Sequence, residues 1–181
     1  MSSFLGRKDL SRGVRNNNPG NLVITSDNWT GKVLKSQNTD GRFEQFKEVK
    51  FGIRAMIIDI IGDIGKGKNT VRKLISEYAP SFENDTNKYV SVVSSALGVN
   101  PDSVIKEVDF LFLLKISRAI ITHENGKDGS LIVDSDILDA IDIINRKEVN
   151  GVVINSKNKL KYNIIIIPLF LFFYTVLTVA L

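Results

Sequence analysis

The chain has no cysteine, and His123 is the only histidine among its 181 residues. Without cysteine, disulfide bonds, thiolate zinc sites, iron–sulfur clusters and cysteine nucleophiles are excluded. A metal centre built on several histidines is excluded as well, and the sequence contains no glycine-rich phosphate loop or calcium loop. We therefore expect no metal and no cofactor, and any catalytic chemistry should fall to carboxylates.

Charged residues are missing from one stretch, because residues 163–181 contain no Asp, Glu, Lys or Arg. In the rest of the chain 24 Lys and Arg outweigh 20 Asp and Glu, a net charge of +4. This excess favours weak attraction to polyanions such as anionic lipid or wall polymers. Basic residues never occur in runs longer than two, so the dense basic stripe of a nucleic-acid-binding protein is missing. We expect no nucleic-acid partner.

The uncharged stretch 163–181 is expected to cross a membrane. As a helix, these 19 residues would reach about 28 Å, close to the ~30 Å of a bilayer's hydrocarbon core. Pro168 falls in the first turns, where a missing N–H costs little, and three lysines precede Tyr162 as anchors at one interface. The alternative is a buried helix or strand of a soluble fold. We favour the membrane because the stretch has no polar face to meet water.

The remaining chain is long enough for one domain of ordinary size. Residues 1–10 lack the apolar core of a signal peptide, so we expect a tail-anchored protein whose soluble domain comes first and stays on the cytoplasmic side during synthesis. The expected organisation is a mobile arm, a lysozyme-like catalytic domain, a polar linker and a transmembrane anchor, over 1–14, 15–146, 147–162 and 163–181.

The soluble body is expected to be α+β and mostly α, with a small β element near its N-terminus. Three short extended pieces at 22–24, 32–34 and 43–46 could pair, and Asp40-Gly41 is a hairpin-turn signal between the last two. Helical periodicity follows. It predicts helices over 49–64, 71–78, 86–97 and 108–122, and a final one capped by Asp134 or Ser135. A short hairpin is expected around Asn150-Gly151.

Five motifs, in this order, resemble one family. They lie at 12–22, which holds the Asn-rich run 16–21, at 28–31, at 40–46 with 52–55, at 78–89 and at 123–126. The set is similar to the lysozyme-like, peptidoglycan-degrading proteins of phage virions and prophages, often described as virion-associated lytic transglycosylases. The resemblance covers residues 12–130. It implies an α-rich lysozyme-like fold that cleaves the MurNAc–GlcNAc backbone.

The order of the motifs implies a further detail. In flagellar-type glucosaminidases and related lysozyme-like enzymes, a catalytic Glu at a helix end precedes the Asn-rich, Trp-Gly and Phe-x-x-Phe elements. Here these elements come first, and the comparable helix-ending residue is Glu124. The chain therefore resembles a circular permutation of that arrangement.

Two glutamates are candidate acids. Glu124 ends an apolar helix, where the helix dipole and limited hydration should raise its pKa, as protonation of a glycosidic oxygen requires. The alternative is an inert surface residue. Glu83 precedes the next helix, where the dipole stabilises the anion, which suits a base, a stabiliser or a loop brace. We favour Glu124, and a mechanism that uses both stays open because the sequence does not give their separation.

Several polar and aromatic side chains are candidates for binding sugar. The amides would bond hydroxyl and N-acetyl groups, although Asn also braces tight loops. The aromatic rings would stack on pyranose rings, although a lone Trp is more often a core anchor. The candidates are Asn18, Asn21, Trp29, Tyr78, Thr86 and Tyr89.

Together these features predict a lytic transglycosylase anchored in the virion membrane, or in the host inner membrane during assembly. It would act on peptidoglycan as the phage penetrates the cell wall, bound to a lipid bilayer through residues 163–181 and with other virion proteins as candidate partners. Two alternatives remain. One is a muramidase or N-acetylglucosaminidase, and the other is a non-catalytic virion membrane protein with a degenerate lysozyme-like fold.

Overall fold

The computed structural model describes residues 2–79, 85–144, 148–149 and 152–155. Glu83, most of the expected linker and all of the stretch 163–181 lie outside the described residues. Within the described part, no helix is both long and apolar enough to cross a membrane.

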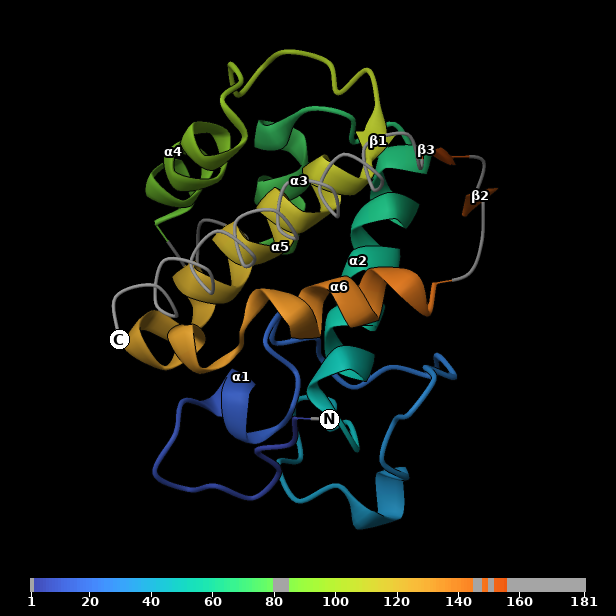
Figure 1. The fold of residues 1–181 in the computed structure, drawn as a ribbon, viewed down its shortest axis with the longest axis vertical. Coiled ribbons are helices and arrows are strands. Elements are labelled where there is room, and N and C mark those ends of the chain that lie inside the picture. The colour runs from blue at the N-terminus through green and yellow to red at the C-terminus, as the bar shows by residue number, and fades with distance from the viewer. Residues whose placement is uncertain (1, 80–84, 145–147, 150–151, 156–181) are drawn as a thin grey trace, which may run out of the picture.

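The described chain is mostly helical, with one small sheet (Figure 1). The elements are, in order, α1 (Arg12–Arg15), η1 (Lys35–Gln37), α2 (Val49–Gly65), α3 (Val71–Tyr78), α4 (Thr86–Leu97), β1 (Val108–Asp109), α5 (Phe110–Asn125), η2 (Gly126–Leu131), α6 (Asp134–Asp142), β2 (Glu148–Val149) and β3 (Val152–Asn155). The expected α+β class with mostly α structure is confirmed.

Helices α2 and α5 form the centre of the core. Helix α6 packs along α2, α4 packs along α5, and α3 packs on α4 (Figure 1). The two central helices are apolar because they bury side chains on more than one face. Fully buried side chains come from both: Ile53, Ile57 and Ile61 of α2, and Leu113, Ile116 and Ile120 of α5.

The helix boundaries follow local capping signals. Thr70 caps α3 by accepting the N–H of Lys73, and Asp85 caps α4 by accepting the N–H of Lys88. Gly98 ends α4 in the left-handed conformation, with φ of 70°, as glycine does at many helix ends. These boundaries agree with the sequence. Helix α6 differs, because neither Asp134 nor Ser135 caps it and the helix begins without a side-chain cap at Val133.

The sheet lies elsewhere than the N-terminal β element that the sequence predicts. Strands are ordered β1-β3-β2, with β3 parallel to β1 and antiparallel to β2. The register pairs Val149 with Val152, so β2 and β3 flank residues 150–151 as the expected hairpin requires. The N-terminal pieces do pair, but only through isolated bridges, Val23 with Phe43 and Lys32 with Phe46. Backbone hydrogen bonds join these pieces, among them Ile24 N–H to Arg42 at 2.9 Å and Val33 N–H to Gln45 at 2.8 Å. Side-chain amides of the Asn-rich loop add further bonds.

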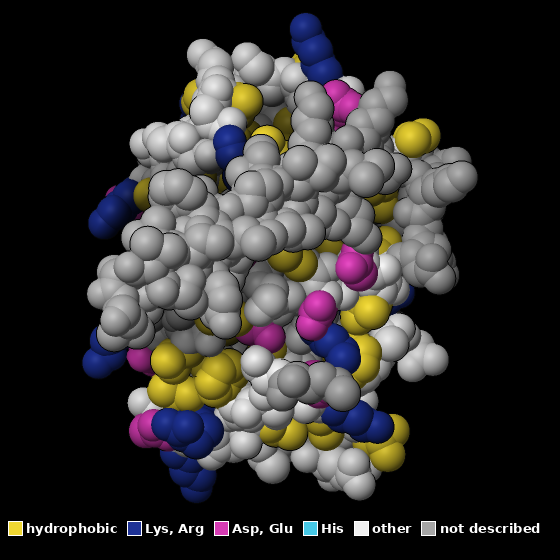
Figure 2. All heavy atoms as spheres, viewed as in Figure 1, with side chains coloured by type: hydrophobic (Ala, Val, Ile, Leu, Met, Phe, Trp, Pro, Cys, Tyr) yellow, Lys and Arg dark blue, Asp and Glu magenta, His cyan; other side chains and the backbone are white. Residues whose placement is uncertain are grey.

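Residues 2–14, which we expected to be a mobile arm, are bound to the body in the structure. The N–H of Gly6 donates to the carbonyl oxygen of Arg15 at 3.0 Å, and Ser2 accepts the N–H of Val49 at 3.1 Å. Val14 of α1 is fully buried. On the face shown in Figure 2, the visible Lys and Arg side chains are scattered and do not gather into one basic patch.

Candidate active site

Helix α5 carries Glu124 to the junction between the helical body and the N-terminal loop. The helix ends at Asn125, whose side chain is only 5% exposed. The Asn125 amide nitrogen donates to the carbonyl oxygens of Pro19 at 2.8 Å and Ile121 at 2.9 Å, while its oxygen accepts from the Ser11 hydroxyl at 3.0 Å. One buried amide thus fixes the helix end to the Asn-rich loop and to the start of α1.

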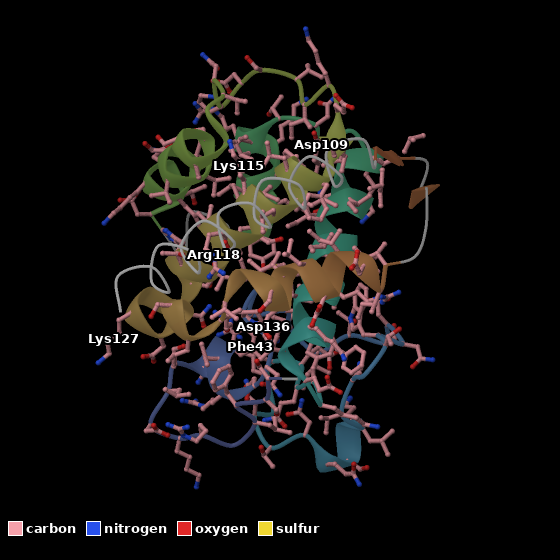
Figure 3. All side chains as sticks on the ribbon, viewed as in Figure 1. Phe43, Asp109, Lys115, Arg118, Lys127 and Asp136 are labelled. Carbon is pink, nitrogen blue, oxygen red and sulfur yellow. The ribbon has the colours of Figure 1, made fainter. Side chains whose placement is uncertain are left out.

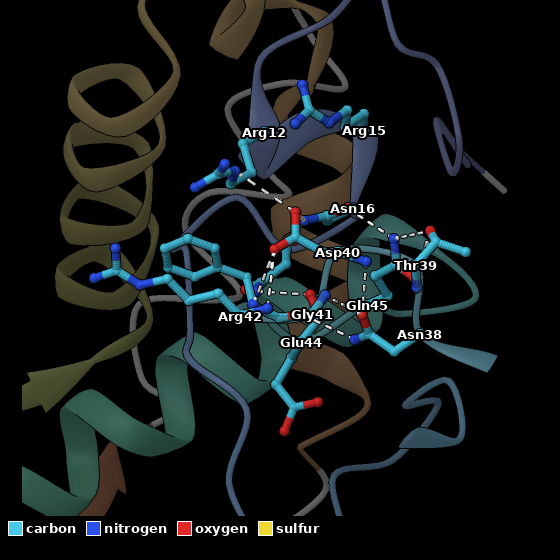
Figure 4. Close-up of polar contacts among 12 residues, drawn as sticks. Arg12, Arg15, Asn16, Asn38, Thr39, Asp40, Gly41, Arg42, Glu44 and Gln45 are labelled. Carbon is cyan, nitrogen blue, oxygen red and sulfur yellow. Dashed lines mark hydrogen bonds and ion pairs between the residues drawn. The ribbon is translucent and has the colours of Figure 1, made fainter. Parts of the chain in front are cut away.

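Asn16 ties the same loop to the turn around Asp40 (Figure 4). Its amide nitrogen donates to Asp40 Oδ2 at 2.9 Å, and its oxygen accepts from Gln45 Nε2 at 2.9 Å. Burial alone would raise the pKa of Asp40, but the bond from Asn16, the backbone N–H of Phe43 and the charge of Arg12 together lower it. Asp40 therefore stays ionised at neutral pH and holds the turn.

Asn18, a candidate sugar ligand, has its hydrogen-bonding groups turned inward. Its side chain is fully buried. The amide nitrogen donates to the carbonyl oxygens of Leu22 and Glu44, each at 2.9 Å, and the amide oxygen accepts the N–H of Leu22 at 3.1 Å. These bonds favour the loop-bracing alternative for Asn18.

Asn21 meets Glu124 at the junction. Its Nδ2 donates to Glu124 Oε2 at 2.9 Å, although the two residues are 103 positions apart. The backbone of Asn21 has φ of 51°, a conformation that Asn tolerates better than most residues. Its Oδ1 is buried and accepts no hydrogen bond within the described chain. An unpaired buried acceptor is costly, so the bond from Asn21 to Glu124 is formed at the expense of this oxygen.

Two tyrosines lie beside Glu124. The Tyr78 hydroxyl donates to the carbonyl oxygen of Gly20. Burial raises the pKa of Tyr78 well above its ordinary value, and the charges of Glu124 and Asp59 raise it further. Burial likewise raises the pKa of Tyr89, with Tyr78 and Glu124 adding to the effect. Both phenols are therefore neutral hydrogen-bond donors at any physiological pH.

The Tyr89 side chain packs against His123 and Glu124. Its ring stacks on the ring of His123, with centroids 3.7 Å apart and planes 17° from parallel. The residue is fully buried, and a side-chain hydrogen bond with Glu124 contributes to the raised pKa of its phenol. The hydroxyl makes no other hydrogen bond within the described residues.

Asp59 of α2 lies close enough to Tyr78 for its charge to act on that tyrosine. Asp59 is not among the candidates predicted from the sequence. Burial raises its pKa first, and the nearby charge of Asp63, one turn along the helix, raises it further. The charge of Asp59 also acts on Tyr78, so this tyrosine lies under the influence of two carboxylates, Asp59 and Glu124. The available signal was an i,i+4 pair of aspartates in the apolar second half of α2, an arrangement of like charges that is locally unfavourable.

The other candidates are Trp29, Thr86 and Glu83. Trp29 is half-buried in the loop before Lys32. Thr86 begins α4, and its hydroxyl donates to the carbonyl oxygen of Ala79 at 2.8 Å, which links α4 to α3. Glu83 is not among the described residues. No three His, Asp or Glu side chains of the described chain come together as a metal site.

Replacing Tyr89 with Phe should make the stability of the protein less sensitive to alkaline pH. At pH 7 we expect the free energy of unfolding to change by no more than about 1 kcal/mol, because one buried hydroxyl and its single contact with Glu124 are removed together. Above the ordinary tyrosine pKa near 10, the wild type should lose stability as the unfolded phenol ionises and the folded one resists; the variant should lose less. Urea unfolding at pH 7 and pH 11 measures both effects. A loss of several kcal/mol at pH 7 would contradict this expectation and give the hydroxyl a larger structural role.

Replacing Asp59 with Asn should stabilise the fold at neutral pH. Since the folded-state pKa of Asp59 is raised, ionising this carboxyl costs stability as the pH climbs through that pKa. The gain from Asn should therefore vanish below the ordinary aspartate pKa of about 3.9 and grow above it. Thermal unfolding of both proteins at pH 3 and pH 7 is the measurement. If the melting temperatures of the wild type and the variant differed equally at pH 3 and pH 7, the raised pKa of Asp59 would be contradicted.

Comparison with known proteins gives one phage relative. No protein-family model matches the chain. Over 125 residues the chain is 30% identical to Protein P5 of Pseudoalteromonas phage PM2, and the alignment covers 66% of this chain and 74% of the phage protein.

Proposed function

This chain belongs to the same family as Protein P5 of Pseudoalteromonas phage PM2, and from its Glu124 site we propose that it is a phage enzyme that cleaves the glycan strands of peptidoglycan. The reaction proposed is that of a lytic transglycosylase. Glu124 is the acid that protonates the glycosidic oxygen, and the same carboxylate then takes a proton from the sugar hydroxyl that closes onto the oxocarbenium-like centre.

The contact between Asn21 and Glu124 carries this proposal. It joins the Asn-rich loop to the helix-ending glutamate, the two motifs that the resemblance to lysozyme-like proteins depends on. Around the half-buried carboxylate lie two neutral phenols, Tyr78 and Tyr89, and one unpaired amide oxygen. One carboxylate surrounded by uncharged polar groups suits a polar, uncharged substrate rich in hydroxyl and N-acetyl groups. It offers nothing suited to a phosphate or a metal.

The finer description of the fold is part of the same proposal. We take the body to be lysozyme-like, with its motifs in circularly permuted order. In its favour, a buried central helix ends at the candidate acid, and its end is fixed by Asn125 to a loop from the opposite end of the sequence. The order along the chain is permuted relative to the resembled enzymes, while the elements meet in space.

We also propose that the protein resides in the membrane of a virion, held by residues 163–181. The phage origin of the relative supports an association with a phage particle, and a stretch of 19 residues without charge supports the anchor. Immunoblotting of purified particles, before and after detergent extraction, tests both parts. Presence only in lysed cells would contradict the virion assignment, and release by high salt without detergent would contradict the anchor.

Muropeptide analysis by mass spectrometry tests the chemistry. Purified full-length protein in mild detergent is incubated with peptidoglycan sacculi, and the soluble products are examined. We expect 1,6-anhydro-MurNAc ends, because one acid/base group suffices for intramolecular capture. Reducing MurNAc or GlcNAc ends would instead identify a muramidase or an N-acetylglucosaminidase. Sacculus binding without any soluble product would favour the non-catalytic membrane protein.

Asp59 distinguishes the hydrolytic alternative from the transglycosylase. A hydrolase needs a second group to activate water or to stabilise the cationic centre, and Asp59 is the further carboxylate whose charge reaches Tyr78. For a transglycosylase, Asp59→Asn should leave the anhydro products and most of the rate intact. Loss of activity together with reducing-end products in the wild type would assign Asp59 to catalysis and overturn the single-acid mechanism.

A further inference from the structure

Two adjoining hollows lie along one side of α5, away from the Glu124 site. The first has a volume of about 510 Å³ and lies between α4 and α5. The second, of about 360 Å³, continues toward β1 and shares Leu111 and Lys115 with the first. We refer to the two together as the α4–α5 groove. Its walls are mainly apolar and include Val92, Ala96, Val99, Val104, Leu111 and Leu114.

The groove exposes large apolar side chains to water. Val92 and Leu111 are each 38% exposed, Val99 is 44% exposed and Val104 is 56% exposed. These four line one continuous depression, whereas singly scattered apolar residues are ordinary on protein surfaces. Since covering apolar surface yields roughly 25 cal/mol per Å², a groove of this kind favours an apolar occupant.

The course of the chain points to that occupant. Strand β3 runs parallel to β1 and pairs Asn155 with Asp109, so the last described residue lies beside the start of α5. Asp109 also lines the second hollow, which therefore opens where β3 ends. In Figure 3, Asp109 marks the end of β1, and Lys115 and Arg118 follow along α5. The groove thus begins at Asn155 and runs down α5.

The following residues have the length and the character that fit this groove. Residues 156–162 are polar and can bridge up to about 24 Å if extended. Residues 169–181, after Pro168, would form a helix of about 20 Å. Helix α5, along which the groove runs, has 16 residues and is about 24 Å long. An apolar helix laid into an apolar groove is a common mode of peptide recognition.

We propose that residues 163–181 bind the α4–α5 groove of their own chain whenever no bilayer holds them. The polar residues 156–162 would pass the mouth of the groove, where charges of both signs, Lys106 beside Glu107 and Asp109, keep the border hydrated. Residues 163–181 then have two alternative binding environments, the groove and the membrane. This inference is independent of glycan cleavage and can fail or hold separately from it.

Thiol alkylation tests the proposal, since the cysteine-free chain can be labelled at one chosen position. Ala96→Cys places a thiol in the groove, and Ser95→Cys places one on the neighbouring exposed position of α4 outside the groove lining. Full-length protein without lipid is treated with a maleimide. We expect alkylation at position 96 to be at least ~10-fold slower than at position 95, the ratio for a groove about 90% occupied. Vesicles of phosphatidylethanolamine and phosphatidylglycerol should abolish the difference.

A variant of the segment provides the second measurement. Adding Leu171→Asp to Ala96→Cys should restore fast alkylation without lipid, because a charge on the segment opposes its burial in an apolar groove. Equal rates at positions 95 and 96 in the absence of lipid would overturn the proposal. So would protection that grows with protein concentration, since it would place the segment of a second copy in the groove. Protection that persists with vesicles would support the groove and contradict the membrane anchor.

Discussion

Replacing Glu124 with Gln is expected to lower the rate of glycan-strand cleavage by about 10² to 10⁴-fold, the usual contribution of a general acid–base group. Gln keeps the size of the side chain, and its carbonyl oxygen can still accept the Asn21 amide, a bond of 2.9 Å in the wild type. The loss should therefore be chemical rather than structural. Release of soluble muropeptides from sacculi measures the rate, and thermal unfolding should show a midpoint near that of the wild type.

Two further variants make the Glu124 result specific. Glu77→Gln changes an exposed glutamate of α3 and should keep full activity. Glu83→Gln addresses the rival acid and should retain most of the activity. An inactive Glu83→Gln beside an active Glu124→Gln would contradict the assignment of the acid. Loss of activity in Glu124→Gln together with a collapsed thermal midpoint would show only that the contact is structural.

Gly52→Ala is expected to cause the largest loss of stability among single substitutions considered for this chain. A Cβ at position 52 would lie 1.9 Å from the carbonyl oxygen of Asn17, a backbone atom that cannot swing away. Helix α2 and the Asn-rich loop would have to separate, and overpacking of this severity costs about 3 kcal/mol or more. Alanine's better helix propensity returns only about 1 kcal/mol. Urea unfolding at constant m-value is the measurement.

Gly98→Ala is the matched comparison for Gly52. Its Cβ would meet no atom within 4 Å, and only the positive φ of 70° opposes it, so a cost of about 1 kcal/mol is expected. The rate of glycan-strand cleavage should also fall more in Gly52→Ala than in Gly98→Ala, because Gly52 packs against the loop that places Asn21 beside Glu124. A Gly52→Ala protein as stable as Gly98→Ala would show that α2 and the loop can shift apart cheaply.

The sequence predicts the helices well because their signals are local. Thr70, Asp85 and Gly98 each act within one turn of the helix that they cap, so the residues themselves mark the boundaries. The hairpin flanking 150–151 is local in the same sense. The pairing of β1 with β3 is not, because Asp109 and Asn155 are brought together by the packing of α5 and the chain that follows. Each strand is too short for its residue pattern to predict which strand it pairs with.

The candidate site was predictable in part. Glu124 at a helix end and an Asn-rich loop are visible in the sequence, and the structure places Asn21 of that loop on Glu124. Which asparagine faces the carboxylate is a different matter. Asn18 turns inward because two carbonyl oxygens need its amide hydrogens, and those partners belong to residues 22 and 44. Asp59 was missed because its proximity to Tyr78 arises only when α2 and α3 pack together.

The bond between Asn21 and Glu124 has a consequence for when the protein becomes active. It closes a loop of 103 positions, and closing long loops is entropically costly, so such contacts tend to form late in folding. Glu124, the proposed acid, therefore gains its hydrogen bond from Asn21 only in the folded protein. Incomplete or locally unfolded chains would carry Glu124 as an ordinary surface carboxylate. The proposed activity would therefore appear only when folding is complete.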